Sequence, residues 1–100
     1  MPKTLDDFKS QFPHTWTAYE QLRNACDHAG PLDAKTAELI KVGISAALEH
    51  EGGLVAHISQ ARAEGAPPAE IYHAILLATG LAGFSAALGG FQTAKEYLEE

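Results

Sequence analysis

The sequence predicts an all-α protein. Apolar residues recur at three- and four-residue spacing along most of the 100 residues, and no run shows strand alternation bounded by hairpin turns. Glycine and proline fall between the periodic segments, where they would separate helices. Because 46% of the residues are hydrophobic and 20% are charged, we expect a folded chain, with a single domain over residues 1–100. The pattern divides into about five to six helices.

The first two helices are predicted from their start and stop signals. Thr4 and Asp7 have the spacing of a capping box, with Asp in place of the usual Glu, and predict a short first helix. Pro13 is suited to the first turn of a second helix, because its missing N–H is not needed there. Gly30 and Pro31 end that helix, since neither residue continues a helix easily.

The second helix has an apolar face that we expect to belong to the core. This face consists of Trp16, Tyr19, Leu22 and Cys26, with Phe12 just before it. Cys26 is the chain's single cysteine, so an internal disulfide framework, a CxxC pair and a zinc knuckle are all excluded. A lone thiol is typical of a reducing compartment, and we expect a cytoplasmic protein.

The later helices are predicted from residues that cap a helix and from glycines and prolines that interrupt one. Asp33 caps a third helix that runs to about Glu49, and its apolar stripe is Leu39, Ile40, Gly43, Ile44, Ala47 and Leu48. Gly52-Gly53 breaks the chain before a fourth helix, which Gly65 ends. Pro67 and Pro68 open a fifth helix, and a last helix begins at Phe84 after a junction over residues 80–83. The buried faces of the fourth and fifth helices are predicted to be Leu54, Ile58 and Ala61, and Ile71, Ile75 and Leu76.

Residues 74–94 carry no charge, which requires a test for a membrane span. The stretch is rich in alanine and glycine, which contribute little to membrane insertion, so we expect no span. Small residues at four-residue spacing instead predict close helix packing, within the chain or between subunits. The chain has 13 acidic and 7 scattered basic residues, so a nucleic-acid partner is not expected.

The residues that could carry chemistry lie in the middle of the chain: Glu38, His50 and His57. His50 and His57 are seven residues apart, which puts them on the same face of an unbroken helix. A carboxylate with one or two imidazoles can transfer protons near neutral pH. The same three side chains could bind a divalent metal. Each histidine could equally have a structural role, so all three interpretations stay open at this point.

The segment from Leu32 to Ile71 resembles the AhpD-like superfamily, which includes the carboxymuconolactone decarboxylases and the alkylhydroperoxidase D proteins. The elements that carry the resemblance are Glu38-Leu39, Ala46-Ala47, His57 to Ala61, Gly65 and Glu70-Ile71. The resemblance implies an AhpD-like orthogonal helical bundle that forms a homo-oligomer: a dimer, trimer or hexamer. We expect the interface over residues 74–90.

The peroxidase branch of this superfamily has a CxxC pair ahead of its histidine, and the corresponding positions here are His50 and Gly53. Thiol peroxidase activity is therefore not expected. The decarboxylase branch also lacks the cysteines, but its usual acidic residue near the position of Gly53 is missing too. The resemblance implies lyase chemistry on a small-molecule carboxylate or lactone, with Glu38 and His57 as the acid–base pair and His50 as a neighbour. His50 or Arg62 could supply positive charge for an anionic substrate.

Two other functions remain open at this stage. In the first, Glu38, His50 and His57 bind a divalent metal; the acid–base interpretation needs no cofactor. In the second, the protein is a non-catalytic oligomeric scaffold, because a shared fold does not fix a function.

Overall fold

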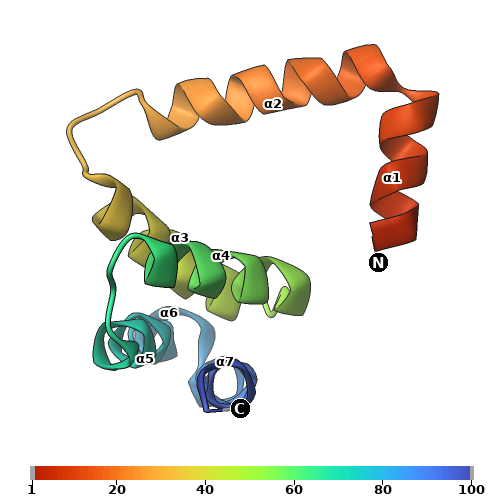
Figure 1. Ribbon diagram of the computed structural model, residues 1–100. Coiled ribbons are helices and arrows are strands. Elements are labelled where there is room, and N and C mark those ends of the chain that lie inside the picture. The colour runs from red at the N-terminus through yellow and green to blue at the C-terminus, as the bar shows by residue number, and fades with distance from the viewer. Residues whose placement is uncertain (1, 100) are drawn as a thin grey trace. The chain divides into compact units, whose positions relative to one another are not determined.

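The structure is a computed structural model that describes residues 2–99, and within them every regular element is a helix (Figure 1). This confirms the all-α prediction. The helices are α1 (Pro2–Gln11), α2 (Pro13–Asp27), α3 (Ala34–Ala47), α4 (Glu51–Ala63), α5 (Pro68–Leu76), α6 (Thr79–Ala82) and α7 (Phe84–Leu98). The chain divides into two compact units, residues 2–31 with α1 and α2, and residues 32–99 with α3 to α7. The single domain expected over residues 1–100 stays a prediction.

The first unit contains no buried residue over positions 3–31. The expectation that the apolar face of α2 belongs to a core is therefore wrong, and Cys26 is exposed rather than buried. The physical reason is size, because about 30 residues in two helices cannot enclose large side chains. Their rings still contact one another: the ring centroids of Phe8 and Phe12 lie 5.4 Å apart, and those of Trp16 and Tyr19 also lie 5.4 Å apart.

The second unit encloses the core. Helices α3 and α4 pack side by side, and α5 and α7 pack against both of them (Figure 1). The core residues are Val42, Ala46, Leu54, Ile58, Ala61, Ala66, Ile71, Ile75, Ala78 and Ala94. The predicted buried faces of the fourth and fifth helices are confirmed, except that Leu76 is exposed.

Helix α3 differs from its prediction in which side it buries. Its buried residues are Glu38, Val42, Ser45 and Ala46. Three large members of the predicted stripe, Ile40, Ile44 and Leu48, are exposed instead. The helix is apolar on more than one side, so its spacing alone could not tell which side would meet α4 and α7. Because α3 buries the side that carries Val42 and Ala46, the carboxylate of Glu38 also lies inside the second unit.

Two predicted helix starts are displaced. Helix α1 begins at Pro2, so Thr4 lies inside it and the capping-box prediction is wrong. Gly52 and Gly53 lie in the first turn of α4 rather than between helices. The chain turns just before them, at Glu49, which has a positive φ of 56°.

The uncharged stretch over residues 74–94 is divided among α5, α6 and α7. Within residues 2–99, none of the helices combines the length and apolar character that crossing a membrane requires. At Gly90, helix α7 lies so close to α5 and α3 that there is little room for a side chain. A Cβ added at Gly90 would lie 3.0 Å from Ile75 Cγ2 and 3.1 Å from Ala46 Cβ. The close helix approach predicted from the small residues is therefore present within the chain.

Candidate active site

Glu38 and His57 meet across the contact between α3 and α4. The Nδ1–H of His57 donates a hydrogen bond to Glu38 Oε1, with 2.8 Å between the two atoms. The carboxylate side chain is 12% exposed and the imidazole 26% exposed, so the pair is shielded while the ring keeps access to solvent. Because Nδ1 is bound to the carboxylate, the proton-accepting lone pair of the neutral ring is on Nε2. A carboxylate that orients an imidazole in this way is suited to proton transfer.

The second oxygen of Glu38 faces a residue that the sequence analysis missed. Lys41 Nζ lies 3.6 Å from Glu38 Oε2, one helical turn further along α3. Glu and Lys at i and i+3 are neighbours on a helix surface, so the spacing itself was a signal for this ion pair. The carboxylate thus lies between a lysine ammonium and an imidazole. When His57 is protonated, the three side chains together carry a net positive charge.

His50 does not join this pair. It is the N-cap of α4, and its Nδ1 accepts a hydrogen bond from the backbone N–H of Gly53, with 2.8 Å between the nitrogens. A side-chain acceptor at this position satisfies one of the N–H groups that the first turn of a helix leaves unpaired. His50 and His57 therefore lie at the start and in the middle of the same helix, with different partners.

The position of Gly53 depends on the His50 cap. A Cβ at residue 53 would lie 2.5 Å from His50 Nδ1, which is closer than real side chains allow. An acidic residue at this position is therefore incompatible with the imidazole cap as it stands. His50 and Gly53 therefore form one structural arrangement, in which the imidazole cap requires a residue without a side chain at position 53.

The other candidate groups are also placed by the structure. Arg62 donates from a guanidinium nitrogen to the carbonyl oxygen of Ala66, 3.0 Å away, and so braces the turn after α4. Residues 2–99 contain no group of three or more His, Cys, Asp or Glu side chains that could hold a metal ion. In particular, Glu38, His50 and His57 do not form the three-ligand set considered from the sequence.

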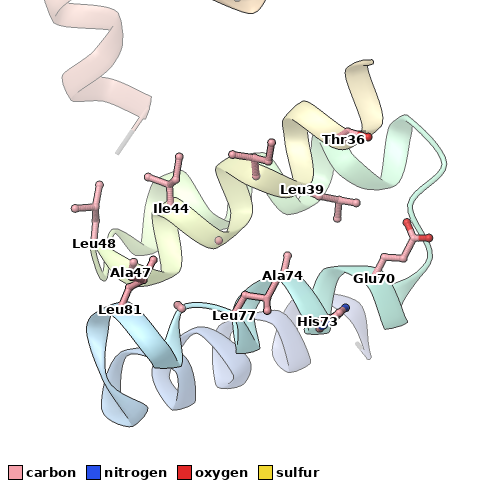
Figure 2. A pocket seen from close by; sticks show the side chains of 13 residues that line it. Thr36, Leu39, Ile44, Ala47, Leu48, Glu70, His73, Ala74, Leu77 and Leu81 are labelled. Carbon is pink, nitrogen blue, oxygen red and sulfur yellow. The ribbon is translucent and has the colours of Figure 1, made fainter. Parts of the chain in front are cut away.

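The second unit has two hollows, and both lie away from the pair formed by Glu38 and His57. An apolar groove of about 470 Å³ runs between α3 and α5–α6, and Figure 2 shows polar Thr36, Glu70 and His73 at one end and Leu48 and Leu81 at the other. A second hollow, of about 380 Å³, has a mixed lining that includes Ala46, Leu54, Gly90 and Thr93, together with the charged or polar side chains Glu49, His50, Glu51, Gln92 and Glu96. Neither hollow is lined by Glu38 or His57.

The fold and the site define a class: all-helical proteins in which two adjacent helices hold a carboxylate–imidazole pair. The sequence model of the carboxymuconolactone decarboxylase family matches residues 11–96. The chain therefore belongs to the carboxymuconolactone decarboxylase family. The match includes both Glu38 and His57, and it extends into both compact units. Comparisons with curated proteins and with solved structures give no match.

Proposed function

We propose that the protein is a lyase that uses acid–base chemistry at Glu38 and His57 on a small-molecule carboxylate or lactone. The observation that carries this proposal is the 2.8 Å hydrogen bond between His57 Nδ1 and Glu38 Oε1, which joins residues of two different helices inside the range that the family model matches. Decarboxylation leaves an electron pair that must be delocalised as an enolate and then protonated on carbon. In its imidazolium form His57 carries a proton on Nε2, which it would deliver to the enolate carbon while returning to the neutral ring, and Glu38 would orient that ring through Nδ1.

Lys41 adds the positive charge that an anionic substrate requires. Of the two cations expected from the sequence, His50 caps α4 and Arg62 binds the Ala66 carbonyl. Lys41 is 3.6 Å from Glu38 Oε2 and 27% exposed, so its ammonium group belongs to the same site as His57. We assign it the role of attracting the substrate carboxylate.

The direct test is decarboxylation of carboxymuconolactone, followed as release of CO2 and loss of substrate. We expect His57→Ala to abolish turnover and Glu38→Gln to lower it by about 10²- to 10⁴-fold, the usual contribution of general acid–base catalysis. His73→Ala is the matched control, because His73 is an exposed histidine of α5 outside the pair, and it should keep full activity. Turnover that survives His57→Ala in a folded variant would overturn the proposal.

A non-catalytic scaffold is the second candidate, and one observation favours it. The apolar groove and the polar hollow of the second unit are lined by neither residue of the pair, although active sites are usually concave. On this interpretation the hydrogen bond between Glu38 and His57 serves to fasten α3 to α4. The two candidates differ in turnover, because a scaffold releases no CO2 from carboxymuconolactone even as the wild-type protein, whereas Glu38→Gln should lower the free energy of unfolding on either interpretation.

We further propose that the protein is a homo-oligomer, a dimer, trimer or hexamer, located in the cytoplasm. Support for assembly through residues 74–90 comes from large apolar side chains that α5–α7 leave exposed, namely Leu76, Leu77, Leu81, Phe84 and Leu88. The small residues Ala78, Ala86, Ala87 and Gly90 are already buried within the chain, so the large residues are what an interface would cover. Light scattering at micromolar concentration tests the assembly, and a monomer would contradict it.

A further inference from the structure

We propose that His50 makes the start of α4 responsive to pH. In its neutral form the imidazole caps the helix, and when it is protonated it leaves the cap and turns into the polar hollow, the hollow of about 380 Å³ that it lines. The geometry at His50 and Gly53 carries this inference. It is independent of the catalytic proposal, because Glu38 binds His57, seven residues further along the chain, and not His50.

The hydrogen bond of the cap determines which nitrogen of the ring carries hydrogen. A backbone N–H can only donate, so His50 Nδ1, 2.8 Å from the nitrogen of Gly53, is the acceptor. A neutral imidazole has one accepting nitrogen and one N–H, so the hydrogen of this ring is on Nε2. An imidazolium carries hydrogen on both nitrogens and has no lone pair for Gly53. The cap therefore exists only while His50 is neutral.

The charge of an imidazolium is also unfavourable at this end of the helix. The N-terminus of a helix has a partial positive charge from its unpaired N–H groups, and it favours anions over cations. Helix α4 has 13 residues and begins directly after His50, with Glu51 in its first turn. Protonation of His50 therefore removes the acceptor of the cap and adds a positive charge where the helix already has one.

The ring has to move when it is protonated, because it lies directly against Gly53. A Cβ added at Gly53 would lie 2.5 Å from His50 Nδ1 and 3.2 Å from His50 Cε1, so the new N–H would point at the N–H of Gly53. The backbone at this point is held on both sides. The N–H of His50 donates to the carbonyl oxygen of Ser45, 3.0 Å away, and its carbonyl oxygen accepts from Leu54 at 2.9 Å. The movement is therefore expected in the side chain and not in the path of the chain.

The polar hollow offers the imidazolium a better environment. Its charged lining consists of three carboxylates besides His50: Glu49 from the turn before α4, Glu51 from α4 and Glu96 from α7. Helix α3 contributes the uncharged Ala46, and the described residues that line the hollow include no lysine or arginine. Opposite charges near an imidazole favour its protonated form. The neutral ring is thus stabilised at the cap and the charged ring in the hollow, so one proton selects between two positions.

A second histidine of the chain makes the opposite kind of hydrogen bond and provides a control. His28 Nδ1 lies 2.9 Å from the carbonyl oxygen of Asn24, at the end of α2. A carbonyl oxygen can only accept, so this Nδ1 donates, and an imidazole can donate from Nδ1 in both its neutral and its protonated form. Acid should therefore leave the bond of His28 in place while it breaks the bond of His50.

The experiment follows the ring nitrogens of His50 and the amide proton of Gly53 by NMR of the full chain, from about pH 8 to about pH 5, where histidine changes its charge. As the ring becomes protonated, we expect the Gly53 amide proton to move to lower chemical shift. Its hydrogen exchange, relative to an unstructured chain at the same pH, should rise about 2- to 30-fold, the factor that corresponds to loss of an N-cap. A Gly53 signal that stays unchanged while His50 becomes protonated would overturn the proposal, as would a ring still neutral at about pH 5.

Three variants assign the response. His50→Asn caps the helix at every pH, so the Gly53 amide should keep its hydrogen-bonded shift throughout. His28→Asn is the matched control, and it should leave the response of Gly53 as in the wild type. Glu96→Gln should move the response to lower pH, because the hollow then contains one carboxylate fewer. A pH response of Gly53 that persists in His50→Asn would refute the role of His50, and an unchanged response in Glu96→Gln would refute the hollow as the position of the charged ring.

Discussion

Replacing Gly90 with alanine tests how closely α7 approaches the rest of its unit. The new Cβ would lie 3.0 Å from Ile75 Cγ2 and 3.1 Å from Ala46 Cβ, and both neighbouring residues are buried. Overpacking of a dense core costs about 1–3 kcal/mol. Alanine recovers about 1 kcal/mol through its higher helix propensity. We therefore expect Gly90→Ala to change the free energy of unfolding by between about 0 and −2 kcal/mol.

The neighbouring glycine is the matched control. Gly89 lies on the same helix, and a Cβ added there would meet nothing within 4 Å. Gly89→Ala should therefore raise the free energy of unfolding by about 0.5–1 kcal/mol through propensity alone. The gain in propensity is common to both variants, so the difference between them, about 1–3 kcal/mol, measures the steric term.

Urea denaturation at one fixed protein concentration measures both variants, because self-association would make stability depend on concentration. A difference of 1 kcal/mol corresponds to about 4–8 °C in Tm for a domain of this size. If Gly90→Ala proves as stable as Gly89→Ala, α7 does not pack as closely as described, and the explanation of the small-residue pattern is wrong.

Further predictions concern caps and charges. His50→Ala should lower the free energy of unfolding by about 0.5–2 kcal/mol through loss of the α4 cap, while His50→Asn, which can cap, should restore most of it; equal losses in both variants would contradict the capping role. Hydrogen bonds from Thr36 lower the pKa of Asp33 from its ordinary value of 3.8, and hydrogen bonds from Lys95 and Tyr72 lower the pKa of Glu99 from 4.5. A carboxyl whose pKa is lower in the folded chain contributes stability above its ordinary pKa and loses it as the pH falls through the lowered value, so stability should decline as the pH drops below about 4.5. Asp33→Asn and Glu99→Gln should each flatten this decline in urea titrations at several pH values, and an unchanged slope in both would refute it.

Helix positions were largely predictable from the sequence because their signals are local. Asp33 caps α3 as predicted, and its side chain accepts a hydrogen bond from the N–H of Thr36, 2.8 Å away. Gly65 adopts a positive φ of 95° just after α4, as expected of a residue that ends a helix. The displaced start of α4 also has a local cause, because a histidine side chain replaces the more usual serine or aspartate at the cap.

The candidate site was predictable in part. Family resemblance pointed to Glu38 and His57, and the structure joins them by a hydrogen bond. The sequence spacing alone could not show that His57 binds Glu38 and His50 does not, because a separation of seven residues along a helix predicts the same face for both. Lys41 was missed although its spacing from Glu38 was visible, since an i,i+3 pair on a helix is usually a solvated surface feature.

By itself, the sequence determined the all-α class, most helix boundaries and the absence of a CxxC pair, because periodicity, caps and residue identity are properties of neighbouring positions. Only the tertiary structure decided which side of α3 is buried and which histidine meets Glu38, because both depend on how α4 and α7 pack against that helix. It also left Phe8, Phe12 and Tyr19 exposed, since burial requires a partner surface, and residues 3–31 do not provide one for themselves.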